Sequence, residues 1–254
     1  MSELVLPEDI LPPTTVNPRK MLIFSAPKVG KTTLMAGLED ALIIDLEKGT
    51  DYVAAKKIQV NSIADLRVVA RLIKEKNAAK GGFFYKYIVI DTITKLEEIV
   101  KELAIEIHKK RPLGKTFKGD HYELLALPNG AGYGPLREAF EIVYNMFSTL
   151  CEHLILVGHL KKTSSIKANN GAEISARDIQ LTGRLKEITC MDVDAIGYLY
   201  RTEGNKCVLS FKTSEDDMIT GARPIHLKNT EIVVSELIDG RMVYHWDKVY
   251  IPEN

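Results

Sequence analysis

The sequence predicts an α/β fold, with a mostly parallel sheet that is flanked by helices and becomes antiparallel towards its C-terminal edge. Short apolar runs alternate with stretches whose apolar residues recur at helical spacing, and this alternation is typical of parallel strands joined by helices. The apolar runs are residues 21–24, 41–45, 87–90 and 153–159, and the helical stretches start at residue 32 or cover 63–80, 93–108 and 136–150. Four later runs follow one another across short turns, as antiparallel strands do. These runs are residues 192–201, 206–212, 231–236 and 242–246.

Length and composition are those of an ordinary globular protein. A chain of 254 residues, 45% hydrophobic and 27% charged, suits one large domain with appendages. The formal net charge is zero, so any affinity for nucleic acid must come from local patches. Three widely spaced cysteines favour reduced packing residues, and no apolar run is long enough for a membrane span. Because residues 1–19 also lack the features of a signal peptide, we expect a soluble cytoplasmic protein.

Three parts of the chain are distinguished by composition. Residues 1–19 carry four prolines among apolar residues and are expected to form an extended arm that docks on this domain or on a neighbour. Residues 20–230 are expected to form the core. Residues 231–254 are expected to add a C-terminal β-hairpin, turning at Asp239-Gly240, and a tail packed on the core.

The chain is organised around residues 20–33, which combine a strand, a compact loop and the start of a helix. Gly30 would let the backbone approach phosphate oxygens, Lys31 would reach the β- and γ-phosphates, and the Thr32 hydroxyl would ligate Mg²⁺. The alternative, a chance Gly-Lys-Thr on a surface turn, is disfavoured by the flanking strand and helix. Ser25 stands where the motif usually has its first glycine. The residues expected to bind the nucleotide are Ser25, Ala26, Pro27, Lys28, Val29, Gly30, Lys31, Thr32 and Thr33.

Charged side chains follow the other parallel strands. Asp91 ends the third apolar run and could hold Mg²⁺ through a coordinated water, although capping of the next helix is the alternative. Glu47 could be the general base that deprotonates the attacking water, or else a solvated turn carboxylate, while Asp45 more plausibly ends its strand. His159 leaves a buried strand where it could touch the γ-phosphate, or it could be structural. The six histidines show no zinc-ligand spacing.

Two long polar stretches carry local positive charge. Glycines and prolines interrupt residues 109–134, which are expected to form a loop. It contains Lys109, Lys110, Arg111, Lys115 and Lys118, with Phe117, His121 and Tyr122 among or just after them. The second loop, after His159, contains Lys161, Lys162 and Lys167. Each could be merely a solvated face, but two such loops leaving the nucleotide edge of the sheet favour single-stranded nucleic acid.

The order of these parts resembles the RecA-like ATPases, most closely the phage-encoded core-only recombinases. These are often described as phage nucleotide-binding or AAA-domain proteins and grouped with single-strand annealing proteins. The resemblance covers about residues 20–212. It rests on Ser25-Ala-Pro-Lys-Val-Gly-Lys-Thr-Thr, Leu42-Ile-Ile-Asp-Leu-Glu-Lys-Gly-Thr-Asp, Tyr87-Ile-Val-Ile-Asp-Thr, Gly132-Tyr-Gly, Leu154-Ile-Leu-Val-Gly-His and Met191-Asp-Val-Asp-Ala-Ile-Gly-Tyr.

The resemblance implies a RecA-like P-loop core whose catalytic glutamate is Glu47, with His159 where many relatives have glutamine. It implies that residues of about 111–134 and 160–181 are the DNA-binding loops. It also implies a homo-oligomer, filament or ring, with ATP between subunits and Lys212 or Arg223 acting across the interface.

The expected function is therefore an ATP-dependent, single-stranded DNA-binding recombinase that anneals or exchanges strands and hydrolyses ATP with Mg²⁺. A single-stranded DNA-binding protein is the expected partner, in the bacterial cytoplasm if the chain is phage-encoded. The alternatives are a RecA-type helicase core or helicase loader, and an ATP-dependent scaffold without a DNA role.

Overall fold

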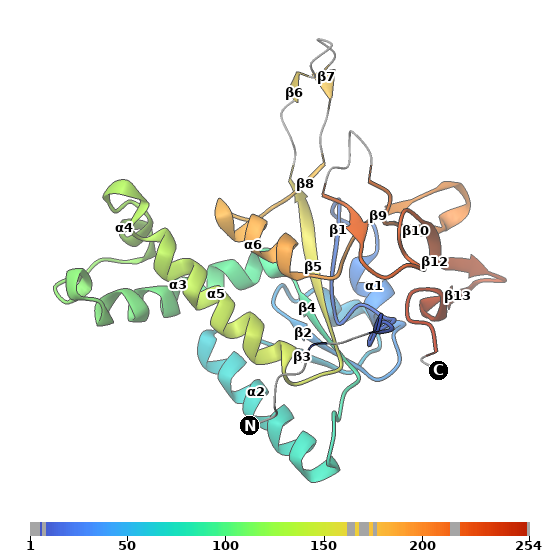
Figure 1. The fold of residues 1–254 in the computed structure, drawn as a ribbon, viewed down its shortest axis with the longest axis horizontal. Helices are drawn as coiled ribbons and strands as arrows, with labels where there is room; N and C mark the ends of the chain where they lie inside the picture. The colour runs from blue at the N-terminus through green and yellow to red at the C-terminus, as the bar shows by residue number, and fades with distance from the viewer. Residues whose placement is uncertain are drawn as a thin grey trace.

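The computed structural model describes residues 6, 9–161, 166–167, 173–174, 177–213 and 219–252, and a large mixed sheet is its centre (Figure 1). Along the sheet the strands lie in the order β13-β12-β10-β9-β1-β5-β4-β2-β3, with β11 beside β9 and β8 beside β5. The main strands are β1 (Lys20–Ser25), β2 (Ala41–Asp45), β3 (Lys57–Gln59), β4 (Tyr87–Asp91), β5 (His153–Lys161), β9 (Ala195–Arg201), β10 (Cys207–Ser210), β12 (Glu231–Ile238) and β13 (Arg241–Tyr244).

The remaining elements are shorter strands and the helices. The strands are β6 (Ile166–Lys167), β7 (Glu173–Ile174), β8 (Asp178–Ile179) and β11 (Gly221–Ala222). The helices are α1 (Lys31–Ala36), α2 (Ile63–Lys80), α3 (Ile93–Lys110), α4 (His121–Leu125), α5 (Tyr133–Ser148) and α6 (Arg184–Asp192). Figure 1 shows α3, α4 and α5 on the left and the C-terminal strands on the right.

The predicted fold class is confirmed. From β3 to β9 the neighbouring strands are parallel, and β10, β12 and β13 then continue the sheet antiparallel. Side chains alternate between the faces of β1: Leu22 and Phe24 belong to the core under α2, α3 and α5, whereas Met21 and Ile23 belong to the core shared with α1 and the C-terminal segment. Since both faces are covered, this strand is apolar throughout.

The expectation of a loop over residues 109–134 was wrong. Helix α3 continues to Lys110, a 3₁₀ turn follows, and α4 begins after Asp120, whose side chain forms a capping box with Glu123. A β-carbon at Gly114 would lie 1.9 Å from the His108 carbonyl oxygen, and one at Gly132 would lie 1.9 Å from that of Leu124. These glycines therefore allow close packing of the backbone instead of ending its structure.

The strands near residue 190 also differ from the prediction. Residues 184–192 form α6, which the sequence analysis did not anticipate, so β9 starts at Ala195 and not at Asp192. The edge strand β3 was not expected either. Its sequence, Lys-Ile-Gln, has a single apolar residue, which is too short a signal to predict a strand.

The residue before Pro18 and β1 contacts the C-terminal segment at the amino edge of the sheet. Asn17 Nδ2 donates to the Ile251 carbonyl oxygen over 2.7 Å, and the Ile251 amide donates back to Asn17 Oδ1 over 2.9 Å. Before Asn17 the described residues form no helix or strand, and Ile10 is 100% exposed.

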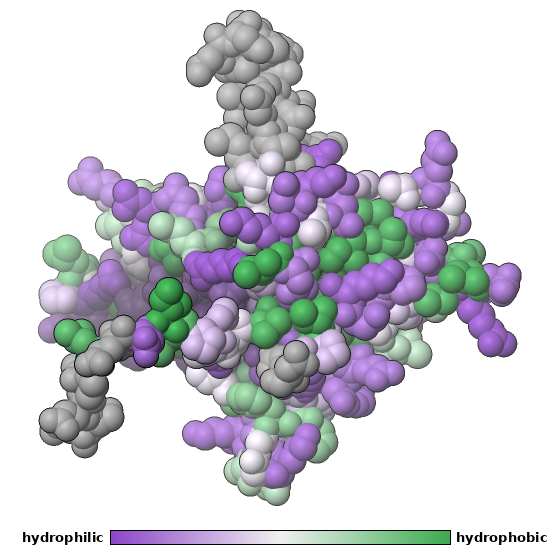
Figure 2. Space-filling model, turned by 45° about the vertical axis from the view of Figure 1, so that its right-hand side comes forward, coloured by the Kyte–Doolittle hydropathy of each residue, from purple (hydrophilic) through white to green (hydrophobic). Residues whose placement is uncertain are grey.

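Hydrophilic side chains dominate the face drawn in Figure 2, with hydrophobic ones in patches among them. In the part of the chain that the structure describes, no helix combines the length and apolarity needed to cross a membrane.

Candidate active site

The phosphate loop joins β1 to α1. Gly30 precedes the helix with a φ of 109°, a conformation that a residue with a β-carbon rarely adopts, and its carbonyl oxygen accepts the Leu34 amide over 2.9 Å. Lys28 also has a positive φ, of 64°. The loop between Ser25 and Lys31 is thus compact, and the amides that open α1 are not used within the helix and remain for a ligand.

Ser25 contributes to the position of the motif lysine. Lys31 is 7% exposed, and its Nζ donates to Ser25 Oγ over 3.1 Å and to the Ala26 carbonyl oxygen over 3.2 Å. Burial lowers the pKa of Lys31, while the nearby carboxylates of Asp91 and Glu47 act in the opposite direction. The serine that replaces the usual glycine therefore supplies an oxygen to the ammonium group.

Thr32 and Asp91 meet across the end of the sheet. The Thr32 hydroxyl donates to Asp91 Oδ2 over 2.8 Å, and Asp91 is 4% exposed. Burial raises the pKa of Asp91 to about 6, with the Thr32 hydrogen bond opposing this and the charges of Glu47 and Asp45 adding to it. A hydroxyl and a carboxylate at this distance fit Mg²⁺, which nucleotide sites hold through one or two protein oxygens together with phosphates.

Asp45 shapes the turn that carries Glu47. Its carboxylate accepts the amides of Glu47 (3.0 Å), Gly49 (3.2 Å) and Thr50 (2.9 Å) and the Thr50 hydroxyl (2.6 Å). These hydrogen bonds keep the pKa of Asp45 low against the effect of burial. Since its oxygens are used within the turn, Asp45 has a structural role and Glu47 is the residue that projects into the site.

Glu47 is held by two side chains from neighbouring strands. The Thr92 hydroxyl donates to Glu47 Oε1 over 2.6 Å, and His159 Nε2 lies 3.1 Å from each carboxylate oxygen. The hydrogen bond with His159 is the main cause that lowers the pKa of Glu47, and the bond from Thr92 adds to it. The carboxylate is therefore ionised at neutral pH.

Strand register brings these groups to one edge. Ser25 is opposite His159, and Asp45 is opposite Asp91, in parallel pairs. The strand β5 lies between β1 and β4, so the phosphate loop and Asp91 are separated by the strand that carries His159.

A family model described as "AAA domain" matches residues 17–221. The chain belongs to this AAA domain family. No curated protein matched it. Among solved structures, the KaiC-like protein PH0186 of the archaeon Pyrococcus horikoshii is similar at 13% identity, over 89% of each chain, with a TM-score of 0.43.

As a member of this family the chain is an ATPase, and its nucleotide is ATP. The phosphate loop, Asp91 and Glu47 each lie at the carboxyl end of a parallel strand, where such sheets bind their ligands.

The basic residues predicted to bind nucleic acid are divided between two places. Lys109 and Lys110 lie in the last turn of α3, followed by Arg111, which pairs with Glu138 at 2.6 Å, and by Lys115 and Lys118. An 18-residue helix is about 27 Å long, so this group lies at the opposite end of α3 from Asp91. The expectation that both basic stretches leave the nucleotide edge was therefore wrong for the first one.

The second basic stretch does start at the nucleotide edge. Lys161 is exposed at the end of β5, two residues after His159. Lys162 is outside the described residues, and the structure describes only the backbone of Lys167, in the short strand β6 that pairs with β7.

The two cations expected to act across an interface are both paired within the chain. Lys212 Nζ is 2.6 Å from Glu231, and an Arg223 guanidinium nitrogen is 3.1 Å from Asp194.

Arg201 contacts the phosphate loop from a distant strand, and the sequence did not predict this contact. It ends β9, and its Nε donates to the Val29 carbonyl oxygen over 2.7 Å. One of its terminal nitrogens lies 3.0 Å from the position of a β-carbon on Gly30. The thiol of Cys207, which is opposite Arg201 in the sheet, lies 3.7 Å from the same carbonyl oxygen. This contact arises because β9 lies beside β1 in the sheet, and no local sequence motif indicates that the two strands are neighbours.

The C-terminal segment packs on the helix that follows the loop. Trp246 Nε1 donates to the Leu34 carbonyl oxygen over 3.1 Å. Gly37, after α1, lies so close to Tyr244 that a β-carbon would be 2.3 Å from its ring. The position of α1, and with it the phosphate loop, therefore depends on residues far along the chain.

Proposed function

We propose that this AAA domain is a single-stranded DNA-dependent ATPase that anneals or exchanges DNA strands, with Glu47 as its general base. The observation that carries the proposal is the contact between Glu47 and His159. His159 bonds the carboxylate and lies two residues before Lys161, the first cation of the second basic stretch. DNA that contacts this stretch would therefore act on the residue that holds the base.

The residues of the site have separate roles in the proposed reaction. The Lys31 ammonium and the amides of the phosphate loop bind and orient the triphosphate. Glu47 takes a proton from water while the water oxygen bonds to the γ-phosphorus and the bond to the ADP oxygen breaks, giving ADP and phosphate. Thr92 and His159 orient the carboxylate. Thr32 and Asp91 would hold Mg²⁺, which supplies charge neutralisation of the phosphates when it is bound.

We further infer that the protein acts as a homo-oligomer, a filament or a ring, on single-stranded DNA, and that a single-stranded DNA-binding protein is its partner. Support comes from the sequence resemblance to phage-encoded recombinases and from the local cations after His159.

The experiment measures ATP hydrolysis with and without single-stranded DNA. We expect DNA to raise kcat, and we expect Glu47→Gln to bind ATP normally while losing about 10²–10⁴-fold in rate, the usual contribution of a general base. An unchanged rate in Glu47→Gln would place the base elsewhere. The absence of both DNA stimulation and salt-sensitive DNA binding would exclude the recombinase and favour a scaffold.

A second comparison locates the DNA site. Replacement of Lys161, Lys162 and Lys167 by alanine is expected to remove DNA stimulation while the KM for ATP stays the same. The matched control replaces Lys80, Lys228 and Lys248, three exposed lysines outside the site, by alanine. Equal DNA stimulation in the two triple variants would remove the second basic stretch from the proposal.

A further inference from the structure

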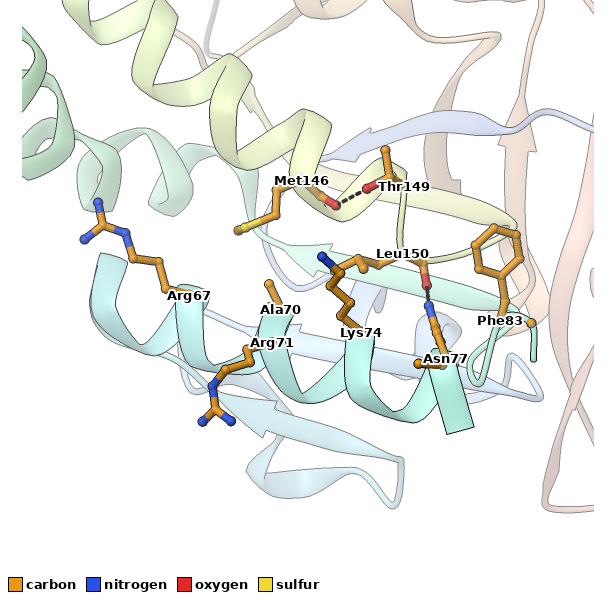
Figure 3. Close-up of a pocket in the computed structure, with 11 residues that line it drawn as sticks. Arg67, Ala70, Arg71, Lys74, Asn77, Phe83, Met146, Thr149 and Leu150 are labelled. Atoms are coloured by element: carbon orange, nitrogen blue, oxygen red, sulfur yellow. Dashed lines mark hydrogen bonds between the residues drawn. The ribbon is translucent and has the colours of Figure 1, made fainter. Parts of the chain in front are cut away.

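A groove runs along the exposed face of α2, between this helix and the C-terminal end of α5 (Figure 3). Its volume is about 810 Å³. Ala70, Met146 and Leu150 give it an apolar lining, and Phe83, which is 40% exposed, lies at one end. Asn77 Nδ2 donates to the Leu150 carbonyl oxygen over 2.9 Å, which ties the two walls together. The groove is therefore a preformed part of the fold.

Cations accompany this apolar lining. Arg67, Arg71 and Lys74 follow one another at spacings of four and three residues, so they lie on one side of α2. Exposed ion pairs engage Arg67 with Glu106 and Arg71 with Glu75. Within the described residues Lys74 has no ion pair, and Figure 3 shows it extending from α2 towards the end of α5. The groove thus suits a segment that has both apolar and acidic side chains.

The N-terminal arm has this chemistry. Its first eleven residues contain Glu3, Glu8 and Asp9, and no lysine or arginine precedes Arg19. Leu6 is 88%, Ile10 100% and Leu11 70% exposed, so these apolar side chains are not buried against their own domain. An isolated exposed apolar residue needs no explanation, whereas a cluster of them indicates a contact surface.

The lengths of groove and segment also agree. The stretch of α2 from Arg67 to Ala78 rises about 16 Å, the length that about five extended residues span. Residues 6–10, Leu-Pro-Glu-Asp-Ile, are such a segment, with acidic residues between two apolar ones.

We propose that residues 6–11 of one copy of this chain occupy the groove between α2 and α5 of a second copy. The carboxylate of Asp9 would face Lys74, and Ile10, on the other side of the extended segment, would enter the apolar lining. Pro12 and Pro13 favour a stiff, extended connection that carries the segment away from its own domain. The inference rests on the homo-oligomer of the proposed function and names the surfaces that form it.

Arm and groove are different surfaces, so the contact is heterologous. Every copy has one arm and one groove, so each copy can bind two others. Repetition of this contact gives a ring if the rotation between copies closes, and a filament if it does not.

The test is sedimentation of the full chain over a concentration series, with and without ATP. Ile10→Asp removes the apolar contact from the arm, and Lys74→Glu reverses the unpaired cation of the groove. We expect each variant to self-associate at least about tenfold more weakly than the wild type, as central contacts of an interface usually do. The matched control is Lys228→Glu, the same charge change at an exposed lysine elsewhere, which should sediment as the wild type does.

Mixing the two variants separates docking on a second copy from docking within one chain. Ile10→Asp retains a groove and Lys74→Glu retains an arm, so the mixture should give a species of twice the 28.4 kDa chain mass and no larger assembly. A wild type that stays at 28.4 kDa, an Ile10→Asp variant that assembles like the wild type, or a mixture without the paired species would each overturn the proposal.

DNA-stimulated ATP hydrolysis is measured in the same samples. Stimulation without any effect of Ile10→Asp on mass would remove this interface and leave the proposed function standing. If Ile10→Asp lowers the mass of the assembly but DNA does not stimulate ATP hydrolysis, the interface stands and the proposed function is excluded.

Discussion

Arg201→Ala should weaken the binding of ATP while leaving the chemistry of the site in place. The Arg201 side chain donates to the Val29 carbonyl oxygen over 2.7 Å and so fixes the outer side of the phosphate loop. A hydrogen bond from a charged group contributes about 1.5–3 kcal/mol, and because Arg201 is exposed we take a lower value of about 1 kcal/mol. That loss corresponds to about fivefold weaker binding of ATP.

The assay is calorimetric titration with ATP, together with steady-state hydrolysis. Glu47 and Asp91 are not touched by the substitution, so kcat at saturating ATP should change by less than about twofold, and the effect should be on KM. Arg241→Ala, at an exposed arginine of β13, is the matched control and should bind ATP as the wild type does. An Arg201→Ala affinity equal to the wild type, or an equal loss in the control, would refute this account of the loop.

Three further predictions concern residues around the site. Thr92→Val removes the hydroxyl that orients Glu47 and also accepts the Lys95 amide at the start of α3, so kcat should fall about tenfold and the free energy of unfolding by about 1 kcal/mol. Thr92→Ser should retain both properties, and a serine variant as impaired as the valine one would contradict the role of the hydroxyl. Because burial raises the pKa of Asp91 from 3.8 to about 6, the folded state binds this proton more tightly, and the nucleotide-free protein should gain stability as the pH falls from about 6 to about 4. The rate of ATP hydrolysis should decline as the pH falls through about 6, since protonation of Asp91 removes the negative charge that faces Lys31 and would hold Mg²⁺. Asp91→Asn should lose the stability trend, and pH profiles of this variant check the prediction. Trp246→Phe removes the indole donor from the Leu34 carbonyl oxygen, which keeps only the Gly37 amide at 3.2 Å, so the free energy of unfolding should fall by about 0.5–1.5 kcal/mol in calorimetry, and an unchanged melting temperature would show that the bond contributes nothing.

The sequence predicted the parallel part of the sheet well because its strands are marked at both ends. The strand at 41–45 coincides with β2, and the run at 87–90 with its terminal Asp91 coincides with β4. The rule that parallel strands present their carboxyl ends at one edge was enough to place Glu47, Asp91 and His159 together.

Other features were hidden because they depend on tertiary contacts. Gly114 and Gly132 have the same local signature whether they interrupt a chain or allow two backbone segments to approach, and only the packing decides between these. Arg201 and Trp246 act through strands and turns that are distant in sequence from residues 29–34. A local pattern carries no information on which strand lies beside β1.

The bond between Trp246 and Leu34 has a consequence for biosynthesis. Its partners are separated by 212 positions, and the ribosome makes the phosphate loop long before the tryptophan. Contacts of such sequence separation form late, because a large loop must close before they contribute. A nascent chain that already contains the complete loop motif therefore lacks the support for α1, and ATP added during translation should stabilise the newly made protein only after the segment with Trp246 has left the ribosome.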